Sequence, residues 1–410
     1  MRALLFENDQ QFWFETLRVL GHAAYGGSDI GEALATAERI TPGDYDGWHD
    51  AWLATADRIA AEAERSQADE HRVSARDGFL RASTYYRTAE FFLHENPGDS
   101  RVAHAYDRSV ECFRAFASLS DPVIEPVEIP YETTVLQGYF YRANNSDAPR
   151  PTMILHNGFD GSSEEMHYFG GAAGIERGYN VLTFDGPGQP SAIHHRNLVL
   201  RPDWENVVGP VLDYLVVRPD VDAARIGLLG VSLGGMLAPR AAAFDSRIAA
   251  VVAVDGVYDA SVPLHRAIPL EYGEIVRRAN VEQDEELDRI LAEAIPASPI
   301  LRWAFGHGQY VTGTSSPRKF LAAYMNFNLF GGVAERISCP TLVCRAEEDL
   351  FFAGNGGIEP EPDRLFSRLT GPRTLLRFTA EEGAEAHGHS GAQRLATSRI
   401  YDWLDETLRP

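Results

Sequence analysis

Cysteine, positive charge and long apolar runs are all scarce in this chain of 410 residues. Its three cysteines form an odd number without a Cys-x-x-Cys pair, so we expect no disulfide framework and a reducing, cytoplasmic location. The N-terminal segment carries acidic residues where a signal peptide needs an apolar core. Because no uncharged apolar stretch reaches about 18 residues, we also expect no transmembrane helix.

Acidic residues dominate the charge: 59 Asp and Glu stand against 37 Lys and Arg, for a net charge of −22. An acidic surface repels phosphate backbones and anionic lipid headgroups, so nucleic acids and membranes are not expected partners. We interpret the charge as a solvated surface that favours solubility. The hydrophobic fraction of 44% and the charged fraction of 23% are those of a globular protein. The length suits roughly two to three domains.

Segments near the N-terminus have apolar residues at helical spacing. They cover residues 32–41, 46–67, 74–95 and 99–120. Pro42-Gly43 supplies turn residues between the first two of them. We therefore predict an N-terminal helical module over residues 1–122.

After residue 122 the pattern changes to strands that alternate with helices, and the first two strands are predicted to form a hairpin. The expected strands are residues 125–131, 135–142, 152–156, 180–185, 225–230, 248–254, 341–346 and 373–378. The expected helices are residues 164–177, 203–217, 233–244 and 389–408. This alternation predicts an α/β fold with a mostly parallel sheet and helices on both faces, built from residues 123–256 and 331–410.

Residues 257–330 interrupt the alternation with a helical segment that is rich in aromatic residues. An insertion at this point of the chain would lie over the carboxyl edge of the sheet, where open α/β sheets bind their ligands. We therefore interpret this insertion as a lid over a binding site.

Ser232 lies in the sequence Gly230-Val231-Ser232-Leu233-Gly234, between a predicted strand and a predicted helix. A Gly-x-Ser-x-Gly turn in that position is typical of a nucleophile elbow. The turn is so tight that the residues two positions before and after the serine must be small. The N-terminus of the following helix, which carries a partial positive charge, points at the site and favours developing negative charge there. We predict that Ser232 is a nucleophile; the alternative is a serine that caps a helix.

A serine nucleophile needs a base, and the base needs an orienting acid, in the chain order Ser, acid, His. Asp349 follows a predicted strand and is the expected acid, with Asp255 as the reserve candidate and a solvated acidic turn as the alternative. His387 lies between the last strand and the last helix and is the expected base. His389 competes with it, although we interpret His389 as a solvent-exposed residue at the start of a helix.

The oxyanion formed by such a serine needs preorganised backbone N–H donors. We expect one donor to be Leu233 and the other to be Phe159, with Asp160 as the alternative. His156 precedes this loop, and we interpret it as a structural histidine.

No cofactor is expected from the motifs of this sequence. His194 and His195 are adjacent but lack a second pair of ligands, so no metal site is predicted. No Gly-x-Gly-x-x-Gly follows a first strand, and Gly186-Pro187-Gly188-Gln189 is too short to cradle a phosphate. Nucleotide cofactors are therefore not expected either.

Taken together, these motifs resemble the α/β-hydrolase superfamily. More narrowly, the chain is similar to the group that contains 2,6-dihydroxypseudooxynicotine hydrolase and the fungal pigment-pathway hydrolases that shorten aromatic polyketides, and more distantly to FrsA-like esterases. The stretches that carry this resemblance span most of residues 74–400. They are SARDGFLRASTYYRTAEFF, NGFDGSSEEM, FDGPGQ, GVSLGG and EEGAEAHGHSG.

The resemblance implies a triad of Ser232, Asp349 and His387. It also implies that an acidic residue near the oxyanion loop contacts the substrate. The candidates are Asp160, Glu164 and Glu165. The alternative for the two glutamates is favourable charge in the first turn of a helix. The family often pairs through its helical module, so a homodimer is also expected.

The resemblance further implies a small aromatic substrate of secondary metabolism, cleaved at a carbon–carbon bond next to a ketone on a hydroxylated ring or in a β-dicarbonyl. Trp303 and Tyr310 of the insertion would then stack on the substrate ring, with ordinary core packing as the alternative. The same residues would equally serve a carboxylesterase or lactonase acting on a bulky apolar ester. A third hypothesis is a catalytically idle scaffold used for binding, which an intact Ser, Asp and His in the expected order argue against.

Overall fold

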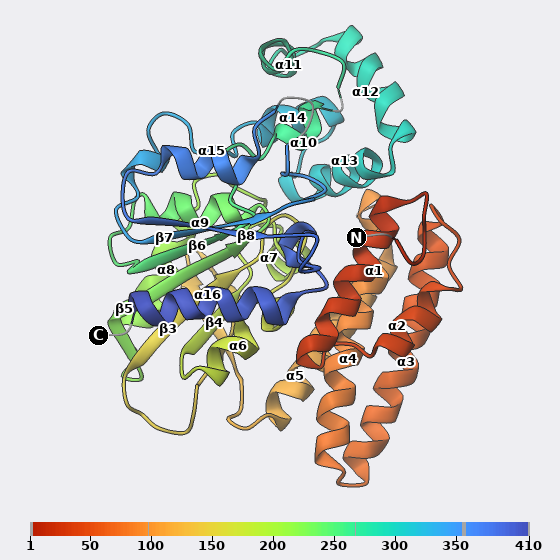
Figure 1. The fold of residues 1–410 in the computed structure, drawn as a ribbon. Helices are drawn as coiled ribbons and strands as arrows, with labels where there is room; N and C mark the ends of the chain where they lie inside the picture. The colour runs from red at the N-terminus through yellow and green to blue at the C-terminus, as the bar shows by residue number, and fades with distance from the viewer. Residues whose placement is uncertain (1–2, 97, 267, 355–357, 409–410) are drawn as a thin grey trace.

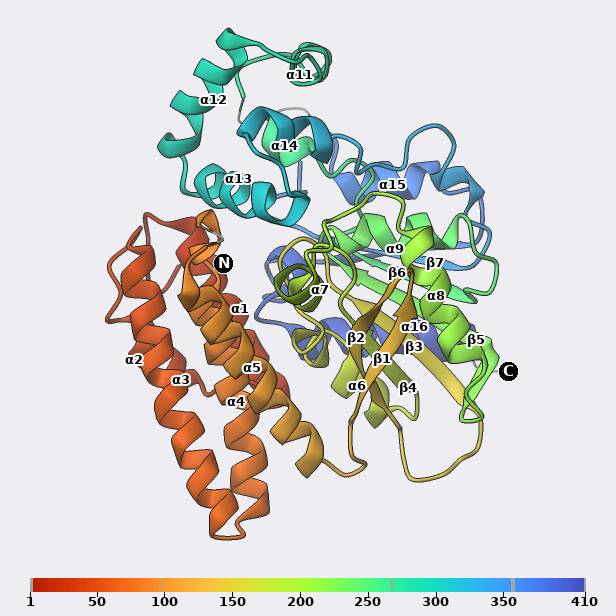
Figure 2. The same ribbon diagram turned by 180° about the vertical axis from the view of Figure 1, so that it is seen from behind.

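The computed structural model describes residues 3–96, 98–266, 268–354 and 358–408. Three parts of the chain meet in it. A bundle of N-terminal helices stands beside a sheet that is covered by helices, and a group of short helices lies across one end of both (Figures 1 and 2). Among the described helices, none combines the length and the apolar character needed to cross a bilayer.

Four of the five N-terminal helices begin where an aspartate side chain accepts a hydrogen bond from a free backbone N–H group. The five helices are α1 (Gln10–His22), α2 (Ile30–Ala37), α3 (Tyr45–Ala68), α4 (Arg72–Glu90) and α5 (Ser100–Leu119). Asp9, Asp29, Asp44 and Asp99 cap four of them in this way, because aspartate satisfies the first-turn donors. Their shared core is aromatic, and the rings of Phe12 and Trp48 lie 4.8 Å apart.

Helix α1 was not among the predicted helices, although its sequence has a recognisable helix start. Asp9 accepts a hydrogen bond from the N–H of Phe12, and a run of apolar residues with Phe12, Trp13 and Leu17 follows it. The prediction began only at residue 32, so it missed the helix that later proves to reach the candidate site.

The sheet has eight strands in the order β1-β2-β4-β3-β5-β6-β7-β8. Their bounds are β1 (Glu125–Tyr131), β2 (Thr134–Tyr141), β3 (Arg150–His156), β4 (Asn180–Phe184), β5 (Val221–Val231), β6 (Ala250–Val254), β7 (Thr341–Ala346) and β8 (Arg373–Phe378). Strands β1 and β2 form an antiparallel hairpin, and β3 to β8 run parallel. The predicted α/β fold is therefore confirmed, and every predicted strand overlaps an observed one.

Helices cover both faces of the sheet, as Figures 1 and 2 show. Helices α8 (Glu205–Val216) and α9 (Gly234–Ala242) pack against one face, and α6 (Gly171–Glu176) and α16 (Gln393–Leu408) against the other. All five residues of β6 are buried, because a strand covered on both faces has no solvent-facing side.

Several helices differ from their predicted form. Residues 164–177 form a short turn of 3₁₀ helix, η3 (Glu165–His167), followed by α6, because Gly170 adopts a φ of 149° between them. Helix α7 (Pro190–Arg196) was not predicted. The final helix α16 begins at Gln393 rather than at residue 389, after the 3₁₀ turn η5 (His387–His389).

The insertion between β6 and β7 is helical, as predicted, and lies next to the top of the N-terminal bundle in both ribbon views. Its helices are α10 (Val262–Arg266), α11 (Tyr272–Ala279), α12 (Glu285–Ala297), α13 (Pro299–Thr312) and α14 (Pro317–Tyr324). Trp303 of α13 stacks on Phe91 at the end of α4, with ring centroids 4.9 Å apart. The insertion and the bundle thus share a contact next to the sheet.

Candidate active site

Ser232 occupies a sharp turn between β5 and α9. Its φ of 62° lies in the left-handed region, where a serine is strained. A Cβ on Gly230 would come within 2.1 Å of the carbonyl oxygen of Gly234, so the turn can close only with glycine at that position. The local sequence therefore produces the tight turn that the elbow motif predicts.

His387 connects Ser232 to Asp349 by two hydrogen bonds. The distance from His387 Nε2 to Ser232 Oγ is 2.9 Å, and from His387 Nδ1 to Asp349 Oδ2 it is also 2.9 Å. The other oxygen of Asp349 accepts hydrogen bonds from the N–H groups of Phe351 and Phe352 at 2.7 and 2.9 Å, which fix the carboxylate. Asp349 and Ser232 lie 38 and 155 positions from His387 in the chain, and the fold brings the three residues into one hydrogen-bonded relay.

A second carboxylate reaches the same nitrogen of the histidine. Asp255, which follows β6 with a φ of 69°, has Oδ2 3.3 Å from His387 Nδ1. Its two oxygens accept the N–H of Gly388 at 2.9 and 3.0 Å. The reserve candidate for the acid therefore lies beside the first candidate.

Burial and neighbouring charges shift the pKa values of Asp255, Asp349 and His387 in different directions. Burial raises the pKa of Asp255 to about 7. Burial also opposes ionisation of Asp349, but the charge and the hydrogen bond of His387 hold its pKa below the usual value. Burial alone would lower the pKa of His387, and the carboxylates of Asp255 and Asp349 outweigh it and raise that pKa to about 9.

His389, the competing base, lies away from the serine relay in a buried position. Its ring packs on Phe378 with centroids 3.8 Å apart, and its Nδ1 lies 3.2 Å from the carbonyl oxygen of Ala384. Burial lowers its pKa to about 4. The interpretation of His389 as solvent-exposed was therefore wrong, since the chain turns inward before α16 begins.

A cavity opens in front of Ser232 and His387, and its mostly apolar wall contains several aromatic rings. The rings come from the N-terminal bundle, the sheet loops and the insertion. They belong to Phe14, Phe159, Phe169, Trp303, Phe320, Tyr324, Phe351 and Phe352. Trp303 therefore lines the cavity. Tyr310 is not part of the described cavity wall, and its hydroxyl lies 2.5 Å from His194 Nδ1.

Arg18 and Asp160 bring charge to this apolar cavity. Arg18 comes from α1 and donates two hydrogen bonds to Glu165, at 2.6 and 2.5 Å, and one to Asp160 at 3.3 Å. Burial disfavours the charged form of Asp160, but Arg18 and Arg87 lower its pKa to about 2. Sequence reasoning missed Arg18 because it overlooked α1, whose Asp9 cap was the available signal.

The acidic residues of the loop are separated by the fold. Asp160 lines the cavity. Glu165 faces Arg18. Glu164 accepts a hydrogen bond from the hydroxyl of Tyr139 at 2.8 Å and is not part of the described cavity wall. Of the three candidates for substrate contact, the structure thus brings only Asp160 to the described wall.

The loop after β3 lies directly against the elbow. A Cβ on Gly158 would come within 2.6 Å of the backbone nitrogen of Leu233, so the two segments touch through backbone atoms. Gln189 donates from its amide to the carbonyls of Asn157 and Gly158 at 2.6 and 3.1 Å and holds the loop in place. The expected oxyanion donors Leu233 and Phe159 therefore belong to touching segments. His156 is buried, with Nδ1 2.9 Å from the carbonyl of Asn157, as a structural histidine would be.

Two groups in the described part of the chain place three potential metal-ligand atoms within 4.8 Å of one another. One contains Asp255, Asp349 and His387. The other contains Glu90, His94 and His194. The prediction that His194 lacks further ligands did not foresee this second group, because its members come from distant parts of the chain.

Comparison with known proteins places the chain among hydrolases. A family model described as "Esterase FrsA-like" matches residues 7–268, and one described as "Alpha/beta hydrolase family" matches residues 153–395. Hydrolase LUC6 of Fusarium sp. is 35% identical, with 97% of this chain and 96% of that protein covered. The 20-hydroxy-prefusarin hydrolase FUS2 of Gibberella moniliformis is 34% identical, with the same shares covered. The crystal structure of 2,6-dihydroxy-pseudo-oxynicotine hydrolase has the same fold, with a TM-score of 0.70, 22% identity and 95% of each chain covered.

Proposed function

Because this chain belongs to the alpha/beta hydrolase family and is a hydrolase, we propose that it cleaves a carbon–carbon bond next to a ketone carbonyl. Ser232 is the proposed nucleophile, His387 the base and Asp349 the orienting acid. The observation that carries the proposal is the relay from Asp349 through His387 to Ser232, with 2.9 Å at each step, which opens into an aromatic cavity. An idle scaffold would not need such a relay, so we favour the catalytic interpretation over the idle-scaffold one.

In the proposed reaction, His387 Nε2 takes the proton of Ser232 while Oγ attacks the substrate carbonyl. The N–H groups of Leu233 and Phe159 stabilise the oxyanion. The bond to the leaving carbon then breaks, and that carbon takes the proton back from His387. A water molecule, activated in turn by His387, hydrolyses the acyl-enzyme and restores the serine.

The leaving carbon sets the substrate class, because an unstabilised carbanion is too basic to depart. In a β-diketone, the fragment that leaves can depart as an enolate. A ring with ortho or para hydroxyls can first ketonise, so that its carbon accepts the electron pair. The aromatic cavity wall suits such a ring, and we assign Asp160 as the acidic residue that contacts its hydroxyl groups. A relative named for a single organic molecule, 20-hydroxy-prefusarin, supports a specialised small-molecule substrate.

An ester is the second candidate substrate, and one observation favours it. The family model that covers residues 7–268 is described as an esterase. The same Ser232, His387 and Asp349 would cleave a bulky apolar aryl ester, with an alkoxide or phenoxide as the easier leaving group.

The test offers both substrates to the protein in one tube. An acylated polyhydroxynaphthalene β-diketone and a matched aryl ester are incubated with wild type and with Ser232→Ala, and the products are identified by mass spectrometry. We expect serine-dependent release of the acyl fragment from the ketone. Cleavage of the ester alone would contradict carbon–carbon hydrolysis and support the second candidate.

A fluorophosphonate probe tests the nucleophile separately from the substrate. We expect wild type to be labelled and Ser232→Ala to be unlabelled. Ser367→Ala is the matched control, because Ser367 is an exposed serine on α15 (Glu361–Arg368) whose hydroxyl bonds only to the helix backbone, at Arg364, in the described part of the chain. Ser367→Ala should be labelled like wild type, and labelling that persists in Ser232→Ala would refute the assignment.

A further inference from the structure

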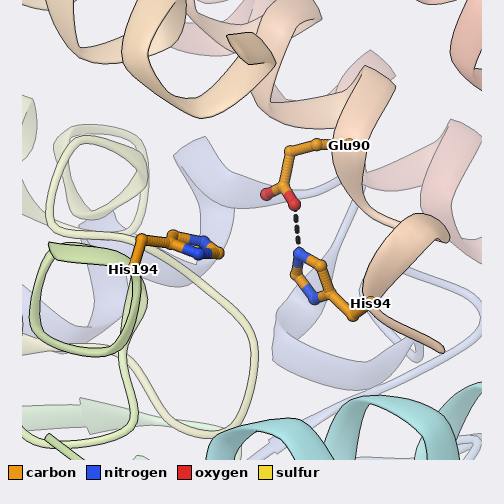
Figure 3. A group of neighbouring side chains, drawn as sticks. All are labelled: Glu90, His94 and His194. Atoms are coloured by element: carbon orange, nitrogen blue, oxygen red, sulfur yellow. Dashed lines mark hydrogen bonds and ion pairs between the residues drawn. The ribbon is translucent and has the colours of Figure 1, made fainter. Parts of the chain in front are cut away.

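Glu90, His94 and His194 gather where α4 ends, outside the cavity that contains Ser232. Glu90 is the last residue of α4, His94 lies four residues later in η2 (Leu93–Glu95), and His194 comes from α7. Figure 3 shows the three side chains pointing toward the space between them. Each offers an oxygen or nitrogen that lies within 4.8 Å of the others, and Glu90 is hydrogen-bonded to His94 Nε2.

The outer nitrogen of His94 is fixed by a chain of hydrogen bonds. His307 Nε2 lies 2.8 Å from the carbonyl oxygen of Phe159, and a carbonyl only accepts, so this nitrogen carries a proton. In a neutral imidazole the second nitrogen is an acceptor, so His307 Nδ1 accepts the hydrogen bond of 2.7 Å from His94 Nδ1. His94 is thus held with Nε2 directed at Glu90.

The outer nitrogen of His194 is fixed in the same manner, since its Nδ1 lies 2.5 Å from the hydroxyl of Tyr310. Its Nε2 is buried and has no hydrogen-bond partner among the described residues. A buried nitrogen without a hydrogen-bond partner destabilises the fold, so the unpartnered Nε2 of His194 indicates that a ligand binds there. Two imidazoles with anchored outer nitrogens and inner nitrogens near one carboxylate match the arrangement of metal-binding histidines.

We propose that Glu90, His94 and His194 bind a divalent transition-metal ion of the zinc class. Two imidazole nitrogens and one carboxylate oxygen are a donor set typical of zinc. Magnesium and calcium favour oxygen ligands alone. The ion would displace the proton shared by Glu90 and His94, and would supply the partner that His194 Nε2 lacks. Ligand atoms around tetrahedral zinc are about 3.3 Å apart, so the Glu90–His94 hydrogen bond opens by a small side-chain rotation.

The site would act as a structural joint between three parts of the chain. Its ligands belong to the end of the N-terminal bundle and to α7 beside the sheet. Their outer partners, His307 and Tyr310, belong to α13 of the insertion. Through His307 the joint ends at the carbonyl of Phe159, in the loop that touches the elbow. The inference does not depend on the reaction proposed above.

The test measures metal content and not activity. Untagged full-length protein is stripped with a chelator and dialysed against Zn²⁺, and the bound metal is measured by mass spectrometry after gel filtration. We expect about one zinc ion per chain in wild type. We expect its loss in Glu90→Gln and in His194→Ala. His195→Ala is the matched control, because His195 is the exposed neighbour whose Nε2 bonds to Asp107 instead, and it should keep the ion.

Two measurements guard against variants that fail to fold. Circular dichroism is recorded for each variant, and Glu90→Gln retains the shape of the native side chain. In wild type alone, zinc addition in weak buffer should release about one proton per ion bound. Substitution of Co²⁺ should give the intense visible bands of a four-coordinate site, with a water molecule as the fourth ligand. Zinc content near zero in wild type, or equal content in wild type and both ligand variants, would overturn the proposal.

Discussion

Asp255→Asn should move the pH dependence of serine reactivity to lower pH, because it removes one of the two carboxylates at His387 Nδ1. The base acts only when His387 is neutral. With its pKa raised to about 9, reactivity in wild type should rise as the pH increases from neutral toward this value. Removal of a carboxylate lowers the pKa of His387, so the rise should come earlier.

The structure limits the size of this shift. A full charge 3.3 Å from Nδ1 is worth about 5 kcal/mol at an effective dielectric constant of about 20, an upper limit of about 4 pKa units. Burial raises the pKa of Asp255 to about 7, so Asp255 is charged where His387 titrates, near pH 9. Because Asp349 remains as the second carboxylate and the three groups titrate together, we expect a shift of about 1–2 units, below that limit.

The assay is the second-order rate of fluorophosphonate inactivation from about pH 6 to about pH 10, which needs no known substrate. Asparagine keeps the acceptor for the N–H of Gly388 and tolerates the left-handed backbone of Asp255, so the fold should persist. Asp349→Asn is the contrasting variant and should slow inactivation at every pH, because Nδ1 loses its closest acceptor. An unchanged profile in Asp255→Asn, or a loss of reactivity greater than in Asp349→Asn, would refute these roles.

Two further substitutions test the surroundings of the site. Arg18→Met leaves the buried carboxylate of Glu165 without its closest cation, so urea unfolding should show a loss of about 3–5 kcal/mol in the free energy of unfolding. The double variant with Glu165→Gln should restore part of this loss. A loss under about 1 kcal/mol would contradict the pairing. Gly158→Ala places a Cβ 2.6 Å from the backbone nitrogen of Leu233, so inactivation of Ser232 should slow by about 10²-fold or more. Gly209→Ala, whose Cβ meets nothing within 4 Å, should leave that rate unchanged, and equal rates in both variants would argue against the donor role of this loop.

Much of the architecture could be predicted because it depends on local patterns. The strands of a parallel sheet are short apolar runs that are buried on both faces, as β6 is, so each strand can be recognised in the sequence. The elbow is equally local, since the small residues around Ser232 follow from the tight turn alone. The candidates Asp349 and His387 then followed from the order Ser, acid, His that is typical of this architecture.

The errors arose where local signals were weak or conflicting. Gly170 and the turn at His387 shortened predicted helices, because a left-handed or extended glycine interrupts an otherwise helical composition. His389 looks like an exposed helix-terminal residue in the sequence, and only its packing on Phe378 shows that it is buried.

The sequence by itself determined the fold class, the elbow and the order of the candidate triad, since each of these depends on residues close together in the chain or on a rule of topology. Only the tertiary structure decided which charges meet. Arg18 pairs with Glu165 from 147 positions away, and Gly388 binds Asp255 from 133 positions away. The joint at Glu90, His94 and His194 likewise spans distant helices. Such contacts depend on how helices dock in three dimensions, and the spacing of residues along the chain carries no record of that docking.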